Sequence, residues 1–223
     1  MKNNSIPIKI SILNVLVLLL LFTIPWVLYQ WFVPSPFGYK ETMFLLAIIF
    51  IFMSYLLFSR NKLDKEHIGL TIGKSFPNTI ITGIIGGVVA FIIVILLLQN
   101  TKQPISLFAL VKSTIYSPIW EELYFRGFMF SSIVILLMEY ELKKYENDER
   151  KYQIMKYFWV SIAIVLVSLI FLLIHTPPSW SQFIASLFFT TIFYYTKSLL
   201  SPIISHAIFN FLISVFAYTV KGI

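Results

Sequence analysis

The sequence contains no cysteine. Disulfide bonds, zinc sites built on Cys and cysteine nucleophiles are therefore excluded together. Charged residues are also scarce, at 12% of the chain, roughly half the share of a soluble globular domain. Hydrophobic residues make up 58% of the chain, more than a soluble core of this size could bury. The chain is therefore expected to fold in a lipid bilayer.

Three of the known designs for an intramembrane peptidase are missing as well. An H-E-x-x-H zinc motif is absent, because Thr-Pro follows His175 and Ala-Ile follows His206. A G-x-S-x-G serine motif is absent too. The only aspartates, Asp64 and Asp148, lie in polar loops and cannot form an intramembrane pair. A peptidase site in this chain would have to be built on glutamate.

The apolar residues are arranged in blocks that contain no Asp, Glu, Lys or Arg: 10–33, 42–58, 79–98, 127–138, 157–174, 183–195 and 198–220. A membrane-spanning helix needs roughly 20 mostly apolar residues. In lipid a single span can form all its backbone hydrogen bonds only as a helix. We therefore predict an all-α polytopic bundle of about seven spans, with six to eight as the range. Block 127–138 is long enough only if its helix extends upstream through Glu121, and block 183–195 is short enough to be tilted, buried or re-entrant.

The blocks divide the chain into two regions. Residues 1–104 are predicted to form three membrane helices. Residues 105–223 are predicted to form a core of four helices, interrupted by a charged connector at 139–156 that continues a helix into water. Gly83 and Gly87 make a G-x-x-x-G step, which predicts close helix packing.

The net charge is +7. In a membrane protein the placement of basic residues in the loops indicates topology, and nucleic acid is not an expected partner. Most of the 17 Lys and Arg residues fall in loops on the same side of the membrane as the N-terminus. Because cytoplasmic loops carry the excess of positive charge, the N-terminus is predicted to be cytoplasmic. The chain is thus expected to be a multi-pass protein of the cell membrane.

Ionisable residues inside apolar blocks are candidates for function, because lipid makes them costly. Glu121 and Glu122 are adjacent, and Arg126 lies four residues after Glu122, on the same helix face. His175 ends one apolar block and His206 lies inside the last one, with Asn210 four residues later.

Each of these residues alone has a plain structural explanation, as an ion pair or hydrogen bond between helices. Their joint occurrence on three apolar helices indicates more. Two carboxylates, two imidazoles and a carboxamide can position a water molecule and take its proton. Glu122 is expected to pair with Arg126, which leaves Glu121 available for chemistry.

The segment "EELYFRG" resembles the E-E-x-x-x-R motif of the CPBP family, which groups CAAX-type prenyl proteases with bacteriocin-processing and immunity (Abi-type) proteins. Phe171 with His175 matches the family's F-x-x-x-H motif, and His206 with Asn210 matches its H-x-x-x-N motif. The three motifs stand in the family's order, and the resemblance covers roughly residues 105–215.

The resemblance implies an endopeptidase that cuts membrane-associated or hydrophobic peptides, with a water held by Glu121 and His175. It implies that His206 and Asn210 support this water or stabilise the oxyanion, and that Glu122 and Arg126 form a structural pair. Zinc held by Glu121, His175 and His206 is one form of the site, and a metal-free form with Glu121 as general base is the other. We favour the metal-free form, because Asn is a poor zinc ligand and a good oxyanion donor.

Two other functions use the same residues. A non-enzymatic immunity or regulatory scaffold would use them to hold helices together, and an ion-coupled transporter would use the buried carboxylates. The transporter is disfavoured, because broken helices and a duplicated half are not evident.

The enzymatic interpretation carries a geometric condition. The charge count places Glu121 and His175 toward the outer side, whereas His206 enters from the inner side. These residues can meet only if the helix of Glu121 starts well upstream of Pro118, or if the segment at 183–195 does not fully span.

Overall fold

The computed structural model describes residues 69–71, 75–98, 107–140, 142–175 and 178–220. These ranges are helical apart from short connections and contain no strand, as expected for an all-α protein. Two compact units divide the chain, Met1–Lys65 and Glu66–Ile223, and every described residue belongs to the second. The expected spans at 10–33 and 42–58 lie outside the described residues, so the count of about seven spans stays a prediction.

Two of the described helices are long and apolar enough to cross a bilayer, α3 (Phe76–Leu98) and α7 (Glu149–Ile174). Only 28% of each apolar window is buried inside the protein. A core helix of a soluble protein would be mostly covered, whereas α3 exposes an apolar face that includes Ile81, Ile85 and Ile92. Such exposed apolar surface suits contact with lipid.

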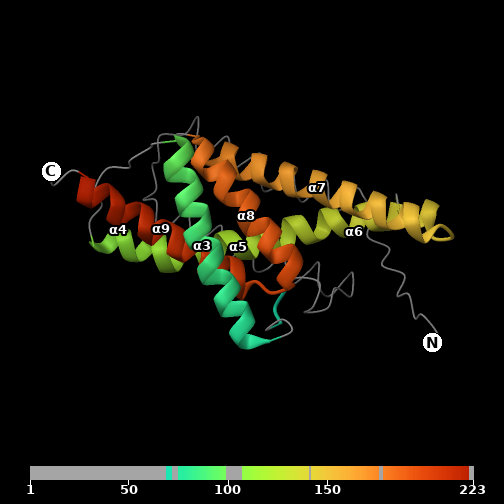
Figure 1. The fold of residues 1–223 in the computed structure, drawn as a ribbon, viewed down its shortest axis with the longest axis horizontal. Coiled ribbons are helices and arrows are strands. Elements are labelled where there is room, and N and C mark those ends of the chain that lie inside the picture. The colour runs from blue at the N-terminus through green and yellow to red at the C-terminus, as the bar shows by residue number, and fades with distance from the viewer. Residues whose placement is uncertain (1–68, 72–74, 99–106, 141, 176–177, 221–223) are drawn as a thin grey trace, which may run out of the picture. The chain divides into compact units, whose positions relative to one another are not determined.

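One continuous helix carries the two glutamates, and we call it the glutamate helix (Figure 1). It consists of α4 (Leu107–Val111), the π-helical segment η1 (Lys112–Tyr116), α5 (Ser117–Glu122), the π-helical segment η2 (Leu123–Phe130) and α6 (Ser131–Tyr140). The helix therefore starts well upstream of Pro118, which is the first of the two arrangements that allow Glu121 and His206 to meet. It also shows that block 127–138 extends upstream through Glu121, as its length required.

The charged connector at 139–156 contains a turn and then the start of a helix. A 3-10 turn, η3 (Leu142–Tyr145), follows the glutamate helix, and α7 begins at Glu149. The Asp148 carboxylate accepts a hydrogen bond from the Lys151 backbone N–H at 3.0 Å and caps α7. This bond holds the pKa of Asp148 below its usual range. The connector is therefore helical at both ends, as the last residues of α6 and the first residues of α7, with the turn between them.

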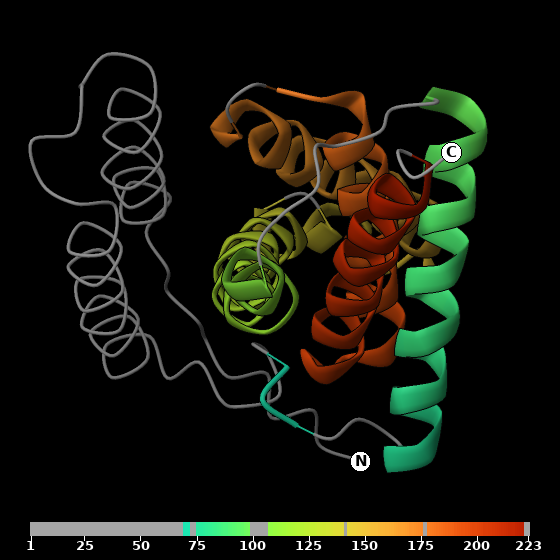
Figure 2. The ribbon, with the colours of Figure 1, turned by 90° about the vertical axis from the view of Figure 1, so that its left-hand side faces the viewer.

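The last two helices, α8 (Trp180–Thr196) and α9 (Leu200–Val220), pack against the others to form the core. Figure 2 shows α9, in red, between α3, in green, and the glutamate helix. Buried apolar residues of α3, α8 and α9 fill the space between these helices: Ala90, Val94, Ala185, Phe189, Phe209 and Ile213. Block 183–195 thus belongs to a helix that is largely packed against protein.

Close packing of α3 against α9 confirms the expectation drawn from the G-x-x-x-G step. A Cβ atom added at Gly87 would lie 2.6 Å from the Ser205 backbone oxygen, so the position tolerates glycine alone. The Ser201 hydroxyl donates to the Thr79 carbonyl, and the Ser205 hydroxyl donates to the Gly83 carbonyl, each at 2.8 Å. These contacts fix the position of α9, the helix that carries His206.

Candidate active site

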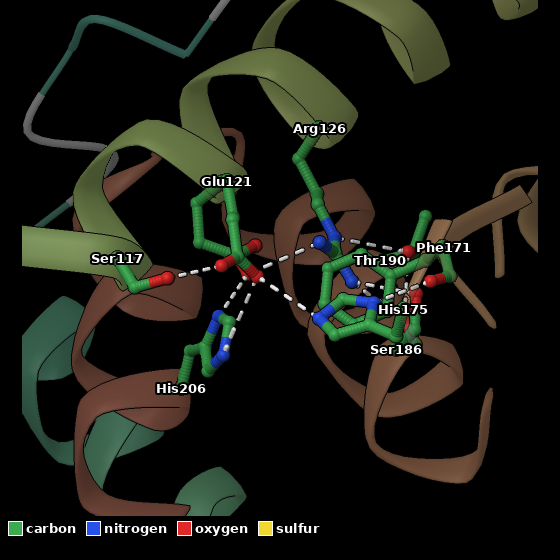
Figure 3. Close-up of polar contacts among 9 residues, drawn as sticks. Ser117, Glu121, Arg126, Phe171, His175, Ser186, Thr190 and His206 are labelled. Carbon is green, nitrogen blue, oxygen red and sulfur yellow. Dashed lines mark hydrogen bonds and ion pairs between the residues drawn. The ribbon is translucent and has the colours of Figure 1, made fainter. Parts of the chain in front are cut away.

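The site lies where the glutamate helix, α7, α8 and α9 meet (Figure 3). The structure brings together five of the residues singled out in the sequence: Glu121, Glu122, Arg126, His175 and His206. They come from segments far apart in the chain, and their contacts depend on the fold. The sixth residue, Asn210, lies one turn beyond His206 on α9 and has a different partner.

Glu121 lies with one carboxylate oxygen held and the other open. Its Oε1 accepts a hydrogen bond from the Ser117 hydroxyl, one turn earlier on the same helix. Its Oε2 is buried and has no hydrogen-bond partner among the described residues. The nearest basic atoms are His175 Nε2 at 3.7 Å and His206 Nε2 at 3.9 Å. Both distances are too long for a direct hydrogen bond, and one water molecule can bridge them.

His175 follows the last residue of α7, where the backbone leaves the helix. Its Nδ1 lies 2.6 Å from the Phe171 carbonyl oxygen. A carbonyl only accepts hydrogen bonds, so Nδ1 carries a proton, and Nε2 is the ring nitrogen that faces Glu121. The F-x-x-x-H spacing thus has a structural reason, because residue 171 supplies the acceptor that orients the imidazole.

Glu122 holds Arg126, as the spacing predicted, and it also holds His206. Arg126 Nη1 lies 3.1 Å from Glu122 Oε1, and both side chains are fully buried. The same oxygen lies 2.8 Å from His206 Nδ1, across 84 residues of sequence. The pair therefore does more than neutralise a charge, since it orients the imidazole that faces Glu121.

Arg126 is surrounded by partners from α8 that the sequence analysis did not weigh. Its Nη2 donates to the Ser186 hydroxyl at 2.7 Å and to the Ser186 carbonyl at 3.3 Å, and its Nε donates to the Thr190 hydroxyl at 3.2 Å. The guanidinium also lies over the rings of Phe171 and Phe189. Ser186 and Thr190 are four residues apart in an apolar block, and this spacing was the available signal.

Aromatic rings hold the two imidazoles in place. The His206 ring stacks on Phe189 with centroids 4.9 Å apart, and the His175 ring lies 4.4 Å from Phe171. Phe171 also meets the edge of His206 at 6.0 Å. These contacts exclude bulk water from one side of the site and limit rotation of both rings.

The Asn210 side chain makes its hydrogen bond to the backbone of the glutamate helix. Its Nδ2 donates to the Ser113 backbone carbonyl in η1 at 2.8 Å. A carboxamide nitrogen has two protons, so one N–H remains for another acceptor. Asn210 thus lies beside the site and links α9 to the glutamate helix, and its second amide N–H is available to another acceptor.

No group of three or more His, Asp or Glu side chains within the described ranges could hold a metal ion as arranged. Glu121 Oε2 lies 3.7 Å from His175 Nε2 and 3.9 Å from His206 Nε2. These are the three residues that would hold zinc in the metal-bound form of the site, and the same spacing accommodates a hydrogen-bonded water in the metal-free form.

Two carboxylates and two imidazoles, of which Glu122 and His206 are buried, thus converge inside a helical protein, an arrangement that suits a hydrolase. Comparison with known proteins agrees with this class. Residues 102–212 match the family model described as Rce1-like, type II CAAX prenyl endopeptidase. The chain belongs to this CAAX-type intramembrane protease family. No curated protein and no solved structure matches the chain.

Proposed function

We propose that the chain is an intramembrane endopeptidase that hydrolyses peptide bonds of membrane-associated or hydrophobic peptides. The family relationship supports the reaction class. The observation that carries the mechanism is the unpartnered Glu121 Oε2, which faces His175 Nε2 at 3.7 Å. Two acceptors at this separation can hold one water by both of its protons, which leaves its oxygen lone pairs free for attack.

In the first step, Glu121 Oε2 takes a proton from this water, and the water oxygen attacks the carbonyl carbon of the scissile bond. The bond from Ser117 to Oε1 keeps the carboxylate aimed at the water. His175 Nε2 accepts the second proton of the water as a hydrogen bond, which fixes the direction of attack. General-base assistance of this kind contributes typically 10²–10⁴-fold to a rate.

The tetrahedral intermediate carries a negative oxygen that needs donors. The protonated His206 ring offers Nε2–H while its Nδ1–H stays on Glu122, and Asn210 offers its second amide proton. Such donors contribute 10²–10³-fold each in other hydrolases. In the second step the C–N bond breaks, and Glu121 passes its proton to the leaving nitrogen, which balances the hydrolysis.

The experiment is a cleavage assay with purified protein in detergent or proteoliposomes, using libraries of hydrophobic and prenylated peptides. Wild type is expected to cleave at least one peptide, and Glu121→Gln, which keeps the size and the bond to Ser117, is expected to lose that cleavage. Equal activity of the two proteins would end the assignment. Comparing membrane peptides of cells that carry either protein would identify the substrate.

The fully buried Glu122–Arg126 pair favours one other function, a non-enzymatic immunity or regulatory scaffold of the same fold. In that case the polar network only ties α8, α9 and the glutamate helix together. A complementation test separates the two proposals, because Glu121→Gln would retain full function in a scaffold and lose it in a peptidase.

The membrane topology proposed with this function is a multi-pass protein of the cell membrane with a cytoplasmic N-terminus, supported by the loop charges. Substituted-cysteine labelling suits the chain well, because the natural sequence has no cysteine. Labelling of a cysteine introduced at Lys2 from the outside of intact cells would contradict this orientation.

A further inference from the structure

Pro118 lies in the middle of the glutamate helix, three residues before Glu121, and its side chain is fully buried. Proline has no backbone N–H, so it cannot donate a helical hydrogen bond to a carbonyl upstream. The π-helical segment η1 ends just before it, and the Ser117 N–H donates to the Lys112 carbonyl, five residues back. The two features together leave one carbonyl without a donor in both the α-helical and the π-helical register.

That carbonyl belongs to Ser113. In an α-helix it would accept from the Ser117 N–H, which is already bonded to Lys112. In a π-helix it would accept from residue 118, where proline has no proton to give. A backbone carbonyl away from water needs a partner, and in a membrane the requirement is stronger.

Asn210 supplies that partner from α9, on the far side of the site. Its Nδ2 lies 2.8 Å from the Ser113 oxygen, across 97 residues of sequence. The carbonyl can only accept, so the amide nitrogen and not the amide oxygen must face it. Because the carboxamide is planar, holding one N–H on Ser113 also fixes the direction of the other.

We propose that Pro118 is a positioning residue of the active site: by leaving the Ser113 carbonyl without a backbone donor, it makes that carbonyl the anchor of Asn210. The anchor presents the second amide proton of Asn210 to the reacting carbonyl and fixes α9, with His206 one turn earlier, against the glutamate helix. This inference rests on the proposed peptidase function for its catalytic part and on geometry alone for its structural part.

The test replaces Pro118 with Ala, which adds an N–H that can donate to the Ser113 carbonyl in the π-helical register of η1 or to the Thr114 carbonyl in the α-helical register of α5. The backbone proton competes with Asn210, and a helix that regains its bond should be at least as stable as wild type. The expected result is therefore an unusual pair: a melting temperature that is unchanged or higher, and a kcat lower by roughly 10- to 100-fold, the cost of a slightly misplaced catalytic group. KM should change little, because the oxyanion forms only in the transition state.

The matched control is Pro202→Ala. Pro202 is equally buried but lies in the first turn of α9, where a backbone N–H has no helical partner to lose. Its activity should stay at the wild-type level. A loss in both variants would mean that any change at a buried proline disturbs the enzyme, and the proposal would be rejected.

A second measurement, independent of activity, is hydrogen exchange of the Asn210 side-chain amide. The measurement is an NMR spectrum of protein labelled with ¹⁵N-asparagine. The side-chain amide signals of Asn210 are the ones missing from the spectrum of Asn210→Ala. Wild type should show one amide proton protected from exchange with solvent, and Pro118→Ala should lose that protection. Unchanged Asn210 signals, or a Pro118→Ala protein that fails to accumulate, would overturn the proposal.

The same experiments separate this inference from the proposed function. If wild type and Glu121→Gln do not differ in the rate at which they cleave any peptide, the peptidase assignment fails. The exchange measurement then still decides whether Pro118 directs Asn210. If Glu121→Gln is inactive while Pro118→Ala has wild-type kcat, the peptidase stands and the positioning role is rejected.

Discussion

The carboxylate of Glu122 and the imidazole of His206 share a hydrogen bond of 2.8 Å in the interior of the protein, between Oε1 and Nδ1. Through this bond the ion pair with Arg126 reaches the imidazole that faces Glu121. Two adjacent glutamates therefore act in different places. Glu121 Oε2 faces the two imidazoles, whereas Glu122 binds Arg126 and the far nitrogen of His206.

This difference predicts opposite effects of replacing the two glutamates. Glu122→Ala leaves Arg126 buried without its carboxylate, and breaking a buried pair in this way costs about 3–5 kcal/mol. The variant should be scarce in membranes and unfold at a lower temperature in detergent. Glu121→Ala removes the hydrogen bond from Ser117 and two longer contacts with His175 and His206, and it leaves the Glu122–Arg126 pair in place. It should accumulate and unfold like wild type, without activity.

The measurement is thermal unfolding beside specific activity for both variants. An unstable Glu121→Ala together with a stable but inactive Glu122→Ala would reverse the two roles. Glu122→Gln refines the comparison, because it keeps an oxygen for Arg126 while removing the negative charge. Its stability should lie between those of wild type and Glu122→Ala.

A second prediction concerns the contact between Arg126 and α8. Thr190→Val keeps the shape of the side chain but removes the acceptor of the Arg126 Nε–H at 3.2 Å. A buried donor left without a partner costs about 1–3 kcal/mol. Thr191→Val is the matched control, since Thr191 is only half-buried and has no hydrogen bond to the site. Unfolding should shift for Thr190→Val alone, and equal shifts for both would deny Arg126 this anchor.

Much of this site could be predicted from the sequence, because its signals are local. Lipid makes buried ionisable residues rare, so Glu121, Glu122, His175 and His206 were conspicuous in apolar blocks. The pairing of Glu122 with Arg126 followed from helical spacing alone. The all-helical architecture and the close packing at Gly83 and Gly87 were likewise readable, because each depends on residues close in sequence.

Contacts between distant segments could not be predicted in the same way. The bond from His206 to Glu122 and the bond from Asn210 to Ser113 depend on how α9 is rotated against the glutamate helix. α9 also packs closely against α3, whose residues take no part in the candidate site. The π-helical segments also left no clear signal, since a proline marks a missing donor but not the register that the helix adopts around it.

A third prediction addresses the metal. The metal-free proposal expects purified wild type to cleave its substrate with far less than one equivalent of zinc, and to keep its activity after treatment with a chelator. Metal content by mass spectrometry and activity are measured on the same sample. About one equivalent of zinc, together with loss of activity to a chelator and recovery on adding zinc, would contradict the proposal.

The last prediction concerns α3, which lies outside the segment that matches the family model and yet sets the position of His206. A Cβ atom at position 87 would lie 2.6 Å from the Ser205 backbone oxygen, and backbone cannot rotate away. Gly87→Ala should therefore push α9 outward, with a cost of about 1–3 kcal/mol, typical of overpacking. Because Ser205 precedes His206, kcat should fall as well.

Gly86→Ala is the informative comparison, since its close neighbours are ends of side chains, Ile192 Cδ1 and Ser205 Oγ, and not backbone. A terminal methyl group can move by rotation, so this variant should lose less stability and keep more activity than Gly87→Ala. Val88→Ala, on the exposed face of α3, should behave like wild type. If all three variants unfold and cleave alike, α3 does not position α9, and the orientation of His206 must depend on the glutamate helix and α8 alone.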